Sequence, residues 1–109
     1  MTLADTVDRV EQRDVELSEA PLGYSILALG ELAGAIEGRP GELEYITVEL
    51  HWEGKGVARA ALNEFIELSR DVGSTDVTTN NATHPAMEHI LETEGFERQP
   101  NDIGWIKRV

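Results

Sequence analysis

The sequence predicts a mixed α/β fold, in which an antiparallel strand meander precedes a parallel β-α-β unit, a second helix and a C-terminal strand. Short apolar runs separated by glycine-rich turns occupy residues 24–50, which is typical of antiparallel strands. A helical apolar period follows over residues 57–70, and residues 76–80 form a run rich in β-branched side chains. Because a strand reached through a helix usually lies parallel to the strand before that helix, we expect a mixed sheet.

The N-terminal part has the weakest pattern. Apolar residues recur at helical spacing from Leu3 to Val10, so we expect a short helix over residues 3–14. Residues 7–15 also fit a polar strand, and this alternative stays open. Residues 16–23 include a proline and a glycine and are expected to form a loop.

The remaining elements are bounded by turn and capping residues. Gly73 is expected to end the first long helix, Pro85 suits the first turn of the second, and Gly95 suits its C-terminal cap. The expected strands are 24–29, 32–37, 42–50, 76–80 and 103–109, and the expected helices are 57–70 and 86–94.

The composition limits the class of protein. The 109 residues suffice for one domain with one core, which we expect to span residues 1–109 with residues 1–23 as an abbreviated N-terminal part. No apolar run reaches the length of a membrane span, no secretion signal is present, and there are no cysteines. These features predict a cytoplasmic protein with neither disulfides nor thiolate metal sites.

The charge balance is strongly acidic. Twenty-one acids face nine bases, which gives a net charge of −12 and disfavours nucleic acid as a partner. A basic protein partner and adaptation to high salt are both compatible with this charge. We favour salt adaptation, a halophilic-type composition, because the acids are spread along the chain and lysine occurs only at positions 55 and 107.

A glycine-containing joint links the third expected strand to the first long helix. Residues 48–58 read VELHWEGKGVA, with Gly54 and Gly56 directly before the helix. Glycines let the backbone approach a ligand closely, and the helix dipole favours an anion at this end. The spacing does not fit a Rossmann fingerprint, which needs a third glycine, or a P-loop, which needs Ser or Thr after Gly-Lys.

The order of elements and two motifs resemble the GNAT superfamily of acetyl-CoA-dependent N-acetyltransferases. Its members carry a pattern close to V-x-P-x-[YW]-R-G-K-G-[IV]-[GA] at the joint, which residues 48–58 approach. Further on they carry N-x-x-A-x-x-x-Y-x-x-x-G-F, and residues 84–96 here read HPAMEHILETEGF. The resemblance covers about residues 24–109.

The resemblance implies that acetyl-CoA is the cosubstrate. Family members bind its pyrophosphate with backbone N–H groups of the joint, pair its pantetheine arm with the strand before the joint, and splay that strand from the next parallel one. Asn80 ends the next strand beside this slot, where it either bonds the arm or turns the chain. By position, the implied cofactor-binding residues are Ile46, Thr47, Val48, Gly54, Lys55, Gly56, Val57, Ala58 and Arg59.

Three positions depart from the family pattern. Glu53 replaces a residue that is usually arginine or glutamine, so a cation near the phosphates is lost, for which Lys55 and Arg59 are the nearest replacements. His84 replaces the asparagine. Leu91 replaces a tyrosine that protonates the departing thiolate in many members, and leucine has no proton to donate.

The third strand offers candidates for a general base, which must take a proton from the acceptor amine. Glu42 and Glu44 share one face by the period of two, and Glu49 lies on the other. Glu44 is our first candidate because it precedes the acetyl-binding stretch. A solvated carboxylate without a catalytic role is the equally open alternative.

The acceptor is not specified beyond a small-molecule or peptide amine. Family members have a strand and two helices before the position of Tyr24, so we expect an acceptor side that is open or completed by a second subunit in a homodimer. A catalytically weak or inactive GNAT-fold module remains the alternative function. We expect no membrane partner, and no metal at the acidic and histidine residues of 84–92 because the H-E-x-x-H pattern is missing.

Overall fold

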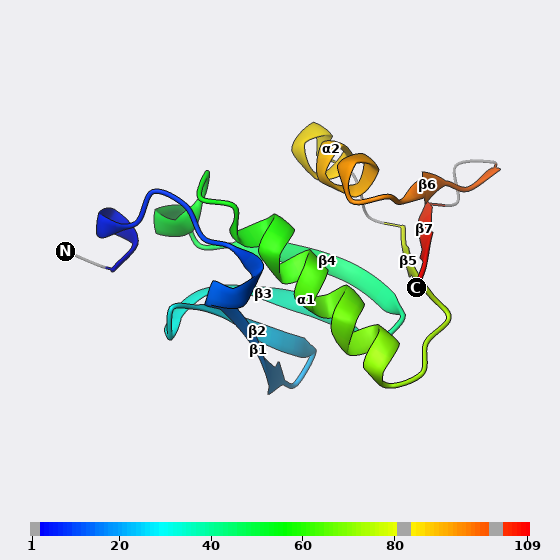
Figure 1. The fold of residues 1–109 in the computed structure, drawn as a ribbon, viewed down its shortest axis with the longest axis horizontal. Coiled ribbons are helices and arrows are strands. Elements are labelled where there is room, and N and C mark those ends of the chain that lie inside the picture. Colours follow the sequence, from blue (N-terminus) through cyan, green and yellow to red (C-terminus); the bar gives the residue numbers. More distant parts are fainter. Residues whose placement is uncertain (1–2, 81–83, 101–103) are drawn as a thin grey trace.

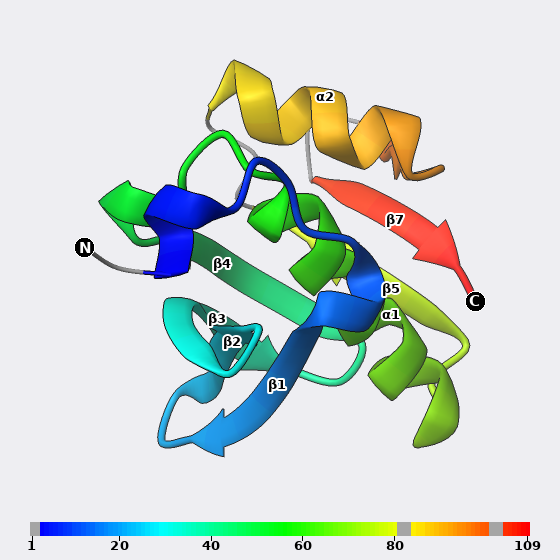
Figure 2. The ribbon, with the colours of Figure 1, turned by 60° about the vertical axis from the view of Figure 1, so that its left-hand side comes forward.

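The computed structural model describes residues 3–80, 84–100 and 104–109, and is an α+β fold. Its strands form one seven-stranded mixed sheet in the order β1-β2-β3-β4-β5-β7-β6. Helix α1 lies across one face of β1 to β4, and α2 lies above the β5–β7 end (Figures 1 and 2). The elements are η1 (Leu3–Thr6), η2 (Gln12–Asp14), β1 (Val15–Ala20), β2 (Gly23–Ala28), β3 (Glu31–Arg39), β4 (Glu42–Val48), η3 (Leu50–Trp52), α1 (Val57–Asp71), β5 (Asp76–Thr79), α2 (Pro85–Thr93), β6 (Glu97–Arg98) and β7 (Trp105–Arg108).

The predicted elements from the meander onward are confirmed within a few residues at each end. Strands β2, β3 and β4 pair antiparallel, and β5 pairs parallel to β4 as expected after a helical crossover. Pro85 occupies the first turn of α2, and Gly95 takes a positive φ of 91° just beyond it. The first residue of the final predicted strand, residue 103, lies outside the described residues.

The prediction for the N-terminal part is wrong. Residues 3–14 contain two short 3₁₀ helices rather than an α-helix, and β1 occupies most of the segment that was expected to be a loop. Ala4 and Val10 enter the core singly, so their helical spacing does not reflect one helix face. Pairing with β2 forms the strand despite its polar composition, because tertiary contacts outweigh local preference.

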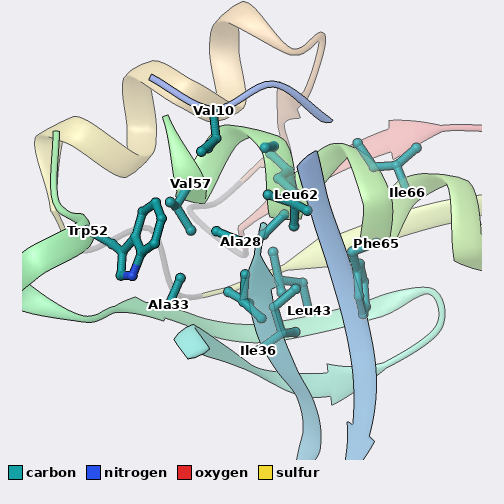
Figure 3. Close-up of a cluster of buried hydrophobic side chains, with 14 of the residues drawn as sticks. Val10, Ala28, Ala33, Ile36, Leu43, Trp52, Val57, Leu62, Phe65 and Ile66 are labelled. Carbon is teal, nitrogen blue, oxygen red and sulfur yellow. The ribbon is translucent and has the colours of Figure 1, made fainter. Parts of the chain in front are cut away.

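The core lies between α1 and the sheet. Figure 3 shows Leu62 and Phe65 of α1 directed toward Ile36 and Leu43 of the strands. Leu62 and Phe65 are fully buried, and the Phe65 ring meets the Tyr24 ring edge to face at 6.3 Å between centroids. Burying such side chains contributes on the order of 2 kcal/mol each, so α1 is fixed firmly against the sheet.

A β-bulge interrupts the pairing of β3 with β4. Glu37 pairs with Tyr45 and Gly38 with Leu43, which leaves Glu44 without a partner in β3. Gly38 adopts a φ of 134°, a conformation open to glycine, and a Cβ at this position would clash with the Glu42 carbonyl oxygen. Bulges of this kind redirect a side chain, and here the residue concerned is Glu44.

Candidate functional site

The gap between β4 and β5 is the first part of the site. The two strands pair only through Glu42–Thr78 and Leu43–Thr79, whereas β4 continues to Val48. A cavity of about 360 Å³ lies at this point, and we call it the strand-gap cavity. It brings together the predicted residues Glu44 and Asn80, and its lining is Glu42, Leu43, Glu44, Thr78, Thr79 and Asn80.

A second cavity adjoins the first and shares Glu42 and Glu44 with it. It has a volume of about 500 Å³, and we call it the glutamate cavity. An ion pair of 3.0 Å joins Arg39 to Glu42, so part of its negative charge is compensated. The cavity is lined by Glu19, Ala20, Pro21, Leu22, Gly23, Tyr24, Gly38, Arg39, Glu42 and Glu44.

The glycine joint forms the third part of the site, at the far end of β4. Gly54 and Gly56 adopt positive φ values of 74° and 86°, and Gly56 is the N-cap of α1. Within the described part of the chain, none of the backbone N–H groups from Gly54 to Arg59 forms a hydrogen bond. The first turn of α1 contains no acid. This run of free donors at a positive helix end is suited to an anion.

The segment before β1 is attached to this joint, which the sequence did not indicate. The Lys55 ammonium donates to the Val7 carbonyl at 2.7 Å, and the Val10 N–H donates to the Lys55 carbonyl at 2.8 Å. Between these anchors, Arg9 passes close to Gly56: a Cβ added to Gly56 would lie 3.7 Å from Arg9 Cγ. No motif in the sequence connects Lys55 with Val7 or Val10, so the sequence alone does not predict this attachment.

The two expected replacement cations are engaged elsewhere. Arg59 donates to the Glu94 carboxylate and to Thr93 Oγ1, the latter at 2.6 Å, and so connects α1 to α2. Asn63 donates to the other Glu94 oxygen at 2.8 Å. Lys55 is bonded to the N-terminal segment. The contacts of Lys55 and Arg59 are therefore made with other groups and not at the free N–H groups of the joint.

The other predicted positions lie on β4 and α2. On β4, Ile46 and Val48 are partly buried against the core, and Thr47 is exposed. Leu91 is fully buried, so it acts as a packing residue of α2. The His84 ring accepts a hydrogen bond from the Ala86 N–H at 3.1 Å and caps α2, as a small polar residue would.

The described ranges contain neither a metal-binding cluster nor a membrane-spanning helix. Over residues 3–80, 84–100 and 104–109, no group of three or more His, Asp or Glu side chains is arranged to hold a metal ion. No helix in these ranges is both long and apolar enough to cross a membrane.

Comparisons with known proteins give no match. No family model, no curated protein and no solved structure matches this chain. We therefore infer the function from the residues and from their arrangement.

Proposed function

We propose that this chain is an acetyl-CoA-dependent N-acetyltransferase of the GNAT type. The observation that carries the proposal is the arrangement along β4. This strand separates from its parallel neighbour beyond Leu43 and Thr79, carries a bulge at the opening, and ends near a run of free N–H donors. One extended ligand with an acyl group at one end and phosphates at the other fits this order of features.

The binding interactions follow from the main chain. In this proposal the N–H groups from Gly54 to Arg59 hold the pyrophosphate with the help of the α1 dipole. On the side away from β3, residues 45–48 pair with no strand among the described residues, and their peptide groups are available to the pantetheine arm. Asn80, which follows β5, lines the strand-gap cavity.

The chemistry is direct acetyl transfer. Bound acetyl-CoA supplies a thioester carbonyl, to which the neutral amine nitrogen adds as the bond to sulfur breaks. Glu44, placed by the bulge at both cavities, takes the amine proton directly or through water. Leu91 leaves α2 without a proton donor at that position, so the thiolate takes its proton from water.

The glutamate cavity is the acceptor side in this proposal. Glu19, Glu42 and Glu44 line it, and Arg39 offsets one of them. A cationic amine matches this charge, and its reacting nitrogen reaches the strand-gap cavity past Glu44. We therefore expect diamines and lysine-containing peptides to be better acceptors than neutral or acidic amines.

Thermal unfolding with acetyl-CoA tests the binding claim. A ligand that binds the native state alone stabilises it, by about 2.7 kcal/mol at a concentration one hundred times its Kd. We expect the unfolding midpoint to rise with acetyl-CoA concentration, measured by differential scanning fluorimetry in high salt. Adenosine monophosphate at the same concentration is the control and should give a smaller shift. An unchanged midpoint at millimolar acetyl-CoA would exclude both binding and transfer.

Replacing Glu53 tests the position of the phosphates. The Glu53 side chain is exposed beside the joint, where its negative charge opposes an anion. Glu53→Arg is expected to tighten acetyl-CoA binding by about fivefold at low salt and by less at high salt. Isothermal titration calorimetry measures the change, and Glu49→Arg is the matched charge control on the same connection. Equal or weaker binding by Glu53→Arg would place the phosphates elsewhere.

A binding module without catalysis is the second candidate. Leu91 favours it, because this apolar and fully buried side chain gives the thiolate no proton donor from α2. A midpoint shift with acetyl-CoA, combined with no release of free thiol across a panel of diamines and lysine peptides, would identify the module. Thiol release with any of these acceptors would identify the enzyme.

A further inference from the structure

Arg9 lies beside Gly56 of the glycine joint, and neither the motifs nor the packing of the core gives its side chain a role. Arg13, Arg39, Arg59 and Arg98 each form an ion pair with a glutamate. Arg9 forms no ion pair or hydrogen bond with another described residue, although the chain has twenty-one acids. Arg9 therefore carries a positive charge that no described carboxylate pairs with, at a position close to the glycine joint.

The position of Arg9 is fixed from both sides. The residue two positions earlier, Val7, accepts from the Lys55 ammonium, and the next residue, Val10, donates to the Lys55 carbonyl. Val10 is also buried in the core, at 3% exposure. These anchors hold the Arg9 backbone beside Gly56, and a Cβ placed on Gly56 would lie 3.8 Å from the guanidinium carbon Cζ.

The space around Arg9 is hollowed rather than packed. A hollow of about 180 Å³ lies between the N-terminal segment and α1, and its lining includes Arg9, Gly56, Arg59 and Glu11, whose carboxylate is paired with Arg13. Arg59 is engaged by Glu94, whereas the Arg9 side chain is exposed and forms no ion pair with a described residue. Arg9 and Gly56 therefore line the same hollow, next to the run of free N–H groups at the joint.

We propose that Arg9 binds the pyrophosphate of acetyl-CoA and replaces the cation that Glu53 removes from the joint. The inference rests on the proposed function, and it adds a binding residue that the N-terminal segment supplies. Guanidinium groups bind phosphate oxygens through paired N–H donors, and these charge-assisted bonds are stronger than neutral ones. The main-chain donors then fix the position of the phosphates, and Arg9 supplies the positive charge.

Removing the charge of Arg9 tests this inference. Arg9→Gln is expected to raise the Kd for acetyl-CoA by about fivefold to tenfold at low salt, with a smaller effect at high salt. The matched control is Arg13→Gln, which removes an exposed charge from the same segment, 83% exposed and paired with Glu11. The control should change the Kd by less than about twofold. Isothermal titration calorimetry at two salt concentrations gives both values.

Two shorter ligands identify the phosphates that Arg9 contacts. With S-acetylpantetheine, which has no phosphate, wild type and Arg9→Gln should bind equally. With acetylated 3′-dephospho-coenzyme A, which keeps the pyrophosphate, the loss should persist. An equal loss of affinity for S-acetylpantetheine would mean that Arg9 acts through the fold. A loss of affinity that disappears when the 3′-phosphate is removed would place Arg9 at that phosphate and not at the pyrophosphate. Either result overturns the inference.

The outcomes also separate this inference from the proposed function. If wild type binds acetyl-CoA and Arg9→Gln binds it as tightly, the inference fails and the proposed function stands. If wild type does not bind acetyl-CoA, both fail. A parallel unfolding curve for Arg9→Gln without ligand shows whether the variant is folded, and Arg9→Lys, which keeps a charge, should recover part of the affinity.

Discussion

Glu44→Gln is expected to lower kcat for acetyl transfer by roughly 100-fold, because a positioned general base contributes about 10²–10⁴ to such a step. The amide keeps the shape of the side chain and removes its ability to take a proton. The Kd for acetyl-CoA should stay within about twofold, since the cofactor contacts in the proposal are made further along the chain. Free-thiol release, measured with the best diamine or lysine peptide of the panel, gives kcat.

Variants of two neighbouring carboxylates distinguish the loss of a general base from the loss of a negative charge. Glu42→Gln removes a negative charge from the same two cavities, and Glu49→Gln removes one from outside them. We expect Glu42→Gln to raise KM for a cationic acceptor with little change in kcat, and Glu49→Gln to change neither. The deficit of Glu44→Gln should narrow at high pH, where more of the amine is already neutral. Equal losses of kcat for Glu42→Gln and Glu44→Gln would exclude Glu44 as the base.

Gly38→Ala is expected to destabilise the fold by about 3 kcal/mol or more, the largest effect on stability that we predict. The φ of 134° suits glycine alone, and the new Cβ would be forced against the Glu42 carbonyl oxygen and lie 3.1 Å from the Glu44 N–H nitrogen. Neither atom belongs to a flexible side chain, so the bulge itself must rearrange. The urea midpoint of unfolding, measured in high salt, gives the change.

Gly30→Ala is the matched control for this prediction. Gly30 also has a positive φ, 85°, but nothing lies within 4 Å of an added Cβ. This change should therefore cost only the backbone strain of about 1 kcal/mol. If the two variants unfold at the same urea concentration, the close approach at Gly38 does not stabilise the bulge.

The fold was predictable wherever local sequence and tertiary contacts agree. The apolar period of α1, the proline of α2 and the glycines at 73 and 95 each marked an element that the structure contains. The order of these elements also predicted the parallel pairing of β4 and β5. In these places the side chains that favour an element locally are the same ones that pack it.

The N-terminal part was not predictable for the opposite reason. Strand β1 reads VELSEA, and only its inward face, which includes Val15 and the partly buried Leu17, supports a strand; pairing with β2 supplies the rest. The bulge at Glu44 was equally hidden, because a register shift depends on both strands and on the conformation of Gly38. Long-range contacts such as Lys55 to Val7 have no periodicity by which a sequence pattern would reveal them.

The attachment of the N-terminal segment to Lys55 also makes the start of the chain a part of the joint. Side-chain and main-chain bonds from this one residue hold both ends of residues 7–10, so the segment and the loop before α1 are expected to order and release together. A ligand that favours the ordered loop therefore also favours the ordered segment, because the two are bonded together. Trimming the chain to begin after Val10 would therefore do more than shorten a tail: it would leave the Lys55 ammonium without its carbonyl partner at the entrance to α1.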